Sequence, residues 1–178
     1  MVPSFYASLF LSLMLAILLI CPTNAWLSVK VSENMLISIC SWHEDPPFCL
    51  QTLQSDHRTP LVDLVGLTNI SIHLTNVAAK NNMALIRSLV NKTTDPILKA
   101  PFEVYLELYN SILGDLEYAK TALTTHDYFS VKVASDSCMI DTENCRDELT
   151  SSAPPFLQEN NEMRYICETQ VIVSSHLP

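Results

Sequence analysis

The stretch PFEVYLELYNSILGDLEYAKTALTTH, residues 101–126, has the most regular pattern in the chain. Its apolar residues recur at alternating steps of three and four: Phe102, Tyr105, Tyr109, Ile112, Leu116, Ala119 and Leu123. This spacing places them in one unbroken seam along an α-helix. Charged residues such as Glu103, Glu107 and Lys120 fall outside the seam. The stretch therefore predicts an amphipathic helix whose apolar side must pack against other helices.

The residues upstream of this stretch predict a second long helix. A looser apolar stripe runs through residues 60–95 and comprises Leu67, Ile70, Leu74, Val77, Leu85 and Leu89. Pro60 suits the first turn of such a helix, and Asp95-Pro96 suits its end.

Two further helices are expected downstream of a corner at His126-Asp127. One helical face carries Val131, Ala134, Cys138, Cys145 and Leu149. This helix ends before Pro154-Pro155, and a last helix covers about residues 159–176. The chain has only two glycines, so prolines rather than glycine turns separate its elements. Four long helices with short connections predict an all-α fold, an antiparallel four-helix bundle over about residues 60–176.

A helical hairpin is expected before the bundle, over about residues 30–56. Cys40 and Cys49 enclose the eight residues SWHEDPPF. The double proline stops one helix and permits another to begin. The chain can therefore reverse and bring the two Cα atoms within the roughly 5.5 Å that a disulfide needs. We expect Trp42 and His43, inside this connection, to be exposed.

Residues 1–25 predict a secretory signal peptide that is cleaved before Trp26. They contain no charged side chain, are apolar from Phe5 to Ile20 and end in the small residue Ala25. An uncleaved membrane anchor is the alternative interpretation. Residues 26–178 then form one domain. Within it, Asn69-Ile70-Ser71 and Asn91-Lys92-Thr93 are candidate N-glycosylation sites, chance occurrence of the tripeptide being the alternative.

Charge and motif content exclude several function classes. The formal net charge is -9, and all of it lies after residue 25, which argues against nucleic acid or an anionic membrane as partner. The five histidines, at positions 43, 57, 73, 126 and 176, show no metal-ligand spacing. The sequence also lacks a G-x-S-x-G elbow, an H-E-x-x-H motif and a phosphate-binding glycine loop. We therefore expect neither a metal nor a cofactor, and no catalytic activity.

Short motifs follow one another along the chain in a specific order. They are Ile39-Cys40, Pro47-Phe48-Cys49-Leu50, Ser55-Asp56-His57-Arg58-Thr59, Asp63-Leu64-Val65-Gly66-Leu67, Ser88-Leu89-Val90, Asp95-Pro96, Glu107-Leu108-Tyr109, Ala119-Lys120, Asp127-Tyr128 and Thr142-Glu143-Asn144-Cys145-Arg146-Asp147. Their order and spacing resemble the plant inhibitors of invertase and pectin methylesterase. This resemblance implies a secreted bundle that blocks a carbohydrate-active enzyme by binding its substrate cleft.

The resemblance also bears on the five cysteines that follow the leader. It implies that Cys40 pairs with Cys49, and that a second family disulfide joins Cys145 to a position occupied here by Tyr105. Cys138 cannot pair with Cys145 if both stay helical, because seven residues separate their Cα atoms by about 10.5 Å. Cys167 is the remaining candidate partner for either residue. The alternative is that Cys138, Cys145 and Cys167 are buried thiols.

The target enzyme is indicated by the corner before the penultimate helix. Many invertase inhibitors of the family carry Pro-Lys-Phe there, whereas this chain reads HDYFS over residues 126–130. The resemblance therefore favours pectin methylesterase as the partner, bound one-to-one by a monomer in the apoplast or cell wall. Acid invertase, in the cell wall or the vacuole, is the alternative target. A secreted helical binding protein without inhibitory activity is the third interpretation.

We expect the target-contact residues outside the apolar seam or at the exposed corner. The candidates are Asp115, Glu117, His126, Asp127 and Tyr128. Together they predict an acidic, hydroxyl-rich face that covers a basic or polysaccharide-binding cleft. Ordinary solvated surface is the alternative interpretation for each of them.

Overall fold

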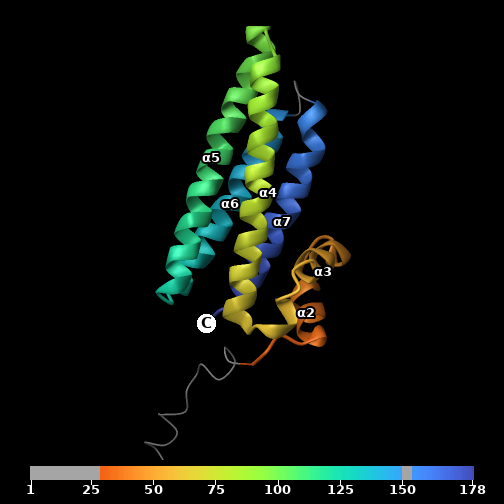
Figure 1. Ribbon diagram of the computed structural model, residues 1–178, viewed down its shortest axis with the longest axis vertical. Helices are drawn as coiled ribbons and strands as arrows, with labels where there is room; N and C mark the ends of the chain where they lie inside the picture. The colour runs from red at the N-terminus through yellow and green to blue at the C-terminus, as the bar shows by residue number, and fades with distance from the viewer. Residues whose placement is uncertain (1–28, 150–153) are drawn as a thin grey trace, which may run out of the picture.

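The computed structural model describes residues 29–149 and 154–178, so the expected leader lies outside the described residues. In the described part, six α-helices and one short 3₁₀ helix occur and no strand does. They are α2 (Glu33–Cys40), α3 (Pro46–Gln54), η2 (Thr59–Leu61), α4 (Leu64–Lys92), α5 (Pro96–Thr124), α6 (Tyr128–Leu149) and α7 (Pro154–Ser175). Helices α4 to α7 form the predicted four-helix bundle, and α2 and α3 form the predicted hairpin beside α4 and α7 at one end of it (Figure 1).

Three helix starts differ from the predicted ones. Pro60 lies in η2, and α4 begins later, where the Asp63 carboxylate accepts a hydrogen bond from the Gly66 amide at 2.9 Å. Helix α5 begins at Pro96, so Pro101 lies inside the helix rather than at its start. Helix α7 begins at Pro154, not near residue 159. In each case an acidic cap or a proline suited to the first turn decides the start.

The predicted seam of α5 is confirmed, but the predicted stripe of α4 is only partly right. All seven seam residues of α5 are buried. On α4, Val77 is 44% exposed, whereas Thr68, Ser71 and Thr75 are buried. Their hydroxyls donate hydrogen bonds to carbonyls of the same helix, at 2.8 to 2.9 Å. These small polar residues can therefore face the core, because their polar groups remain satisfied.

A buried polar network joins the four bundle helices. The Tyr109 hydroxyl of α5 donates to Asn160 Oδ1 of α7 at 3.0 Å and accepts from Asn82 Nδ2 of α4 at 3.1 Å. Asn160 Nδ2 in turn donates to the Thr142 carbonyl of α6 at 3.0 Å. Burial raises the pKa of Tyr109, so its hydroxyl stays protonated.

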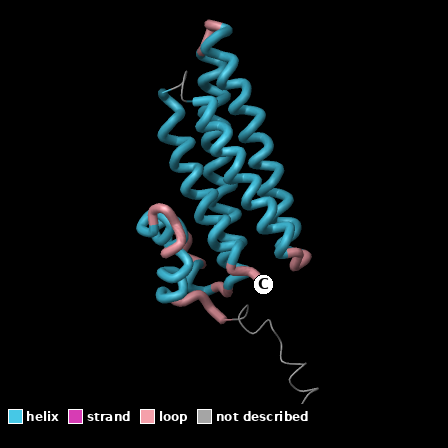
Figure 2. The backbone as a smooth tube through the Cα atoms, turned by 180° about the vertical axis from the view of Figure 1, so that it is seen from behind, coloured by secondary structure: helices cyan, strands magenta, loops and turns pink. Residues whose placement is uncertain are grey.

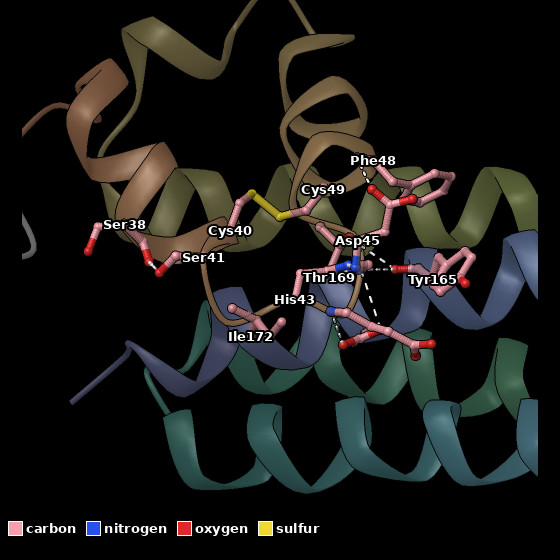
Figure 3. Close-up of a disulfide and its surroundings, with 12 residues drawn as sticks. Ser38, Cys40, Ser41, His43, Asp45, Phe48, Cys49, Tyr165, Thr169 and Ile172 are labelled. Carbon is pink, nitrogen blue, oxygen red and sulfur yellow. Dashed lines mark hydrogen bonds and ion pairs between the residues drawn. A yellow bond between two sulfur atoms is a disulfide. The ribbon is translucent and has the colours of Figure 1, made fainter.

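The predicted Cys40–Cys49 disulfide is present and closes the hairpin with a Cα–Cα distance of 5.6 Å (Figure 3). Trp42 is 76% exposed as expected, but the expectation for His43 is wrong. His43 is buried against α7, where its Nε2 lies 2.9 Å from the Tyr165 carbonyl and its Nδ1 accepts the Asp45 amide at 2.8 Å. This histidine therefore fixes the hairpin on the bundle.

Candidate functional site

The corner between α5 and α6 lies at the same end of the bundle as the hairpin, but on the other side (Figures 1 and 2). Helix α5 ends here in a Schellman motif, in which the Asp127 amide donates to the Ala122 carbonyl and the His126 amide to the Leu123 carbonyl. His126 has a φ of 59°, a left-handed conformation that glycine adopts more readily. The imidazole is exposed, with its ring edge-on to Tyr128. The backbone thus holds His126 at a defined, solvent-facing point.

Helix α6 begins with a cap that also connects to α5. The Asp127 carboxylate accepts hydrogen bonds from the Ser130 amide at 3.1 Å and the Ser130 hydroxyl at 2.7 Å. These bonds lower the pKa of Asp127. The Tyr118 hydroxyl of α5 lies 3.1 Å from the Ser130 hydroxyl, so a chain of hydroxyl and carboxylate groups crosses the corner. The Asp127 carboxylate is therefore held in place by hydrogen bonds at the corner.

Beside this chain of polar groups lie exposed apolar residues that the sequence analysis did not select. Phe129 is 76% exposed, and Val133 and Ile140 follow it at steps of four and seven on the outer side of α6. Exposed aromatic and aliphatic side chains of this kind anchor protein interfaces. We name as the α5–α6 face the residues Asp115, Tyr118, His126, Asp127, Phe129, Val133 and Ile140. The signal for Phe129 was available, since it falls outside the apolar face of α6.

The predicted contact residues do not form one continuous patch. His126 and Asp127 are exposed at the corner, whereas Tyr128 is half-buried against the core, where burial raises its pKa. Asp115 is half-buried on the side of α5 that faces α6. Burial is the main cause that raises the pKa of Asp115, and the negative charge of Asp141 on α6 raises it further.

Glu117 lies on the opposite flank of α5 from Asp115. Two positions along a helix correspond to a rotation of about 200°, which separates the two carboxylates. Glu117 lines a groove of about 300 Å³ between α4 and α5, together with Arg58, Lys80 and Lys120. This flank therefore carries more positive than negative side chains. The prediction of an acidic face applies to the α5–α6 side only.

The two candidate glycosylation sites are both at the surface. Asn69 and Asn91 are exposed on α4, and Asn69 borders the groove beside Glu117. Their modification stays a prediction.

The described residues contain no other obvious chemistry. Within residues 29–149 and 154–178, no three His, Cys, Asp or Glu side chains are grouped as a metal would require. In the same residues, no helix is both long and apolar enough to cross a membrane.

Comparisons with known proteins agree with this description. The family model for plant invertase/pectin methylesterase inhibitors matches residues 34–170. A pectinesterase inhibitor of Actinidia deliciosa is 34% identical over 177 residues, which cover 97% of this chain and 95% of that protein. A Platanus orientalis protein named "Putative invertase inhibitor" is 26% identical over 118 residues, 65% of this chain and 69% of its own. The crystal structure of mutant form A of a pectin methylesterase inhibitor from Arabidopsis has a TM-score of 0.72 at 20% identity, covering 80% of this chain and 97% of that one.

Proposed function

Because the chain belongs to the plant invertase/pectin methylesterase inhibitor family, we propose that it is an extracellular inhibitor that binds pectin methylesterase one-to-one and covers its substrate cleft. The observation that carries this proposal is the similarity to a pectinesterase inhibitor along almost the whole of both chains. The similarity to the Platanus orientalis protein named "Putative invertase inhibitor" is lower and covers less of either chain. Acid invertase is therefore the second candidate target.

The α5–α6 face is the surface through which we propose this binding. It combines exposed apolar side chains, Phe129 above all, with the hydrogen-bonded Asp127 carboxylate at the corner. Apolar anchors supply affinity at an interface, whereas the charged rim favours a partner of opposite sign. The basic groove beside Glu117 lies on another flank and is not part of this surface. Inhibition by such a surface needs no catalytic group, since bound protein simply excludes the substrate.

The test is a titration of the purified protein against pectin methylesterase and acid invertase. We expect pectin methylesterase activity to fall linearly until one equivalent has been added, with invertase activity unchanged. Loss of invertase activity alone would select the second target. Loss of neither activity, from a protein with normal helicity, would contradict inhibition and leave a secreted helical binding protein.

Variants of the corner test the proposed surface separately from the function. Phe129→Ala should weaken inhibition about five- to thirtyfold, because it removes an exposed aromatic anchor worth about 1 to 2 kcal/mol. Ile97→Ala is the matched control, since Ile97 is an exposed apolar residue at the other end of α5. His126→Gly removes the imidazole but suits the left-handed backbone. If the wild type inhibits and neither corner variant weakens inhibition, the surface is wrong although the function stands.

A further inference from the structure

Two side-chain hydrogen bonds fix how α6 and α7 lie against each other. Gln170 Nε2 donates to the Ser135 hydroxyl at 3.0 Å, and Asn160 Nδ2 donates to the Thr142 carbonyl at 3.0 Å. The first pair joins an early residue of α6 to a late residue of α7, and the second pair joins a later residue of α6 to an earlier one of α7. The two helices are therefore antiparallel, in a single register.

This register places two cysteines opposite each other. Cys138 lies three residues after Ser135 on α6, and Cys167 lies three residues before Gln170 on α7. Because the helices are antiparallel, both steps lead in the same direction from the Ser135–Gln170 contact. Cys138 and Cys167 are fully buried, and their side chains form a hydrogen bond with each other. In the structure both residues are thiols.

We propose that in the secreted protein Cys138 and Cys167 form a disulfide that ties α6 to α7. The bond needs a closer approach of two thiols that already interact, to an S–S distance of about 2.05 Å. Cys145 is a poorer partner for Cys138, since seven residues of one helix separate them.

The oxidation is a thiol–disulfide exchange with a disulfide donor of the secretory route, such as oxidised glutathione or a disulfide-bonded oxidoreductase. One cysteine thiolate attacks the donor disulfide and forms a mixed disulfide, releasing half of the donor as a thiol. The second cysteine then attacks the sulfur of the first and displaces the other half as a thiol. Two electrons and two protons leave the cysteine pair, and the donor disulfide becomes two thiols.

The burial of both sulfurs also indicates at which stage of folding this exchange takes place. Its hydrogen bond with Cys167 and burial raise the pKa of Cys138, which lowers its thiolate fraction in the folded protein. A donor also has no access to two buried sulfurs. The bridge therefore forms during folding, before the bundle closes, and a reduced and folded protein oxidises slowly.

The experiment is a non-reducing peptide map of the full chain secreted by a eukaryotic host. Trypsin leaves Cys138 and Cys145 in one peptide, residues 133–146, and Cys167 in another, residues 165–178. A second cleavage after Glu143 separates Cys138 from Cys145. We expect a linked pair that contains Cys138 and Cys167. Recovery of these two as alkylated thiols, or a link from Cys145 to Cys167, would overturn the proposal.

Thermal unfolding gives a second and independent readout. Closing the loop between Cys138 and Cys167 with a disulfide should raise Tm by about 5 to 10 °C. Reductant should therefore lower the Tm of the wild type by more than that of Cys138→Ser, which lacks the Cys138–Cys167 bridge and keeps the Cys40–Cys49 bridge. An equal effect of reductant on both proteins counts against the bridge. If the variant does not fold, the peptide map of the wild type decides alone.

Discussion

The hairpin and the bundle are stabilised in different ways. Helices α2 and α3 have 8 and 9 residues, too short to be stable alone in water, and a disulfide joins them. The bundle helices have 22 to 29 residues and bury an aromatic cluster instead. In that cluster the Phe156 ring lies 5.8 Å from that of Tyr105 and 5.5 Å from that of Tyr109. In the small unit covalent closure adds to the burial of Leu36, Ile39 and Leu53, whereas burial of a larger apolar area supports the bundle.

The contact between the two units combines apolar packing with polar groups, since Leu36, Ile39 and Leu53 of the hairpin region belong to the same buried core as the bundle. His43 bonds to the Tyr165 carbonyl (Figure 3). The Glu44 amide donates to the Glu168 carboxylate at 2.8 Å. Arg164 pairs with Glu44 at 2.6 Å while its guanidinium covers the Tyr165 ring. These groups hold the hairpin against α7, and α3 also contacts α4. We expect the hairpin to loosen before the bundle core opens.

The largest effect on stability is expected from a cavity in the bundle. Phe156→Ala removes a fully buried ring from between Tyr105 and Tyr109, so we expect a loss of about 3 to 5 kcal/mol in the free energy of unfolding. Urea unfolding followed by circular dichroism measures it. Leu157→Ala, at an exposed neighbouring position, is the control and should change little. A loss below about 1 kcal/mol for Phe156→Ala would show that the aromatic cluster does not support the bundle.

A smaller effect is expected from opening the hairpin disulfide. The double variant Cys40→Ser/Cys49→Ser releases a loop whose ends are 9 residues apart, which should cost about 2 to 3 kcal/mol. Amide hydrogen exchange should accelerate in α2 and α3 and stay slow in the cores of α4 to α7.

The matched control for the hairpin is Gln51→Ala, an exposed change in α3. Exchange that accelerates equally in the hairpin and the bundle would mean that the two are one cooperative unit. The comparison between them would then be wrong.

Features that depend on residues close together in the sequence could be predicted, whereas contacts between distant segments could not. The seam of α5 and the Cys40–Cys49 bridge depend on spacing within one segment, and both were predicted correctly. His43 was misplaced because its partner, the Tyr165 carbonyl, is 122 residues away and lies on a helix whose packing no local pattern specifies. The polar side of α4 was missed because Thr68 and Thr75 satisfy their hydroxyls within the helix, which hydropathy does not register.

The candidate site shows the same limit. The corner at His126-Asp127 was located correctly, since a break between two amphipathic patterns is a local signal. Asp115 and Glu117 were grouped because both lie outside the seam. Residues two positions apart on a helix nevertheless lie on different flanks. Phe129 was not among the predicted contacts because acidic and hydroxyl groups defined them, although its exposure follows from the periodicity of α6.

The smallest expected effect concerns the half-buried carboxylate of Asp115 on the α5–α6 face. The pKa of Asp115 is raised in the folded protein, so its carboxylate binds a proton more tightly in the folded state than in the unfolded chain. Above the folded pKa the charged carboxylate therefore destabilises the bundle, and this effect disappears as pH falls below the unfolded value. Asp115→Asn should stabilise the protein at neutral pH, by less than about 1 kcal/mol because the group is partly solvated, and leave it unchanged in acid.

Asp127→Asn at the corner is the matched control, because the sign reverses there. The pKa of Asp127 is lowered by its bonds from Ser130, so its charge stabilises the folded state above the unfolded pKa, and this is lost as pH falls through the folded value. Asparagine can still cap α6, so the variant loses mainly the charge. Denaturant midpoints measured from acid to neutral pH should therefore diverge in opposite directions for the two variants. Parallel curves would mean that burial against α6 does not distinguish Asp115 from an ordinary surface carboxylate.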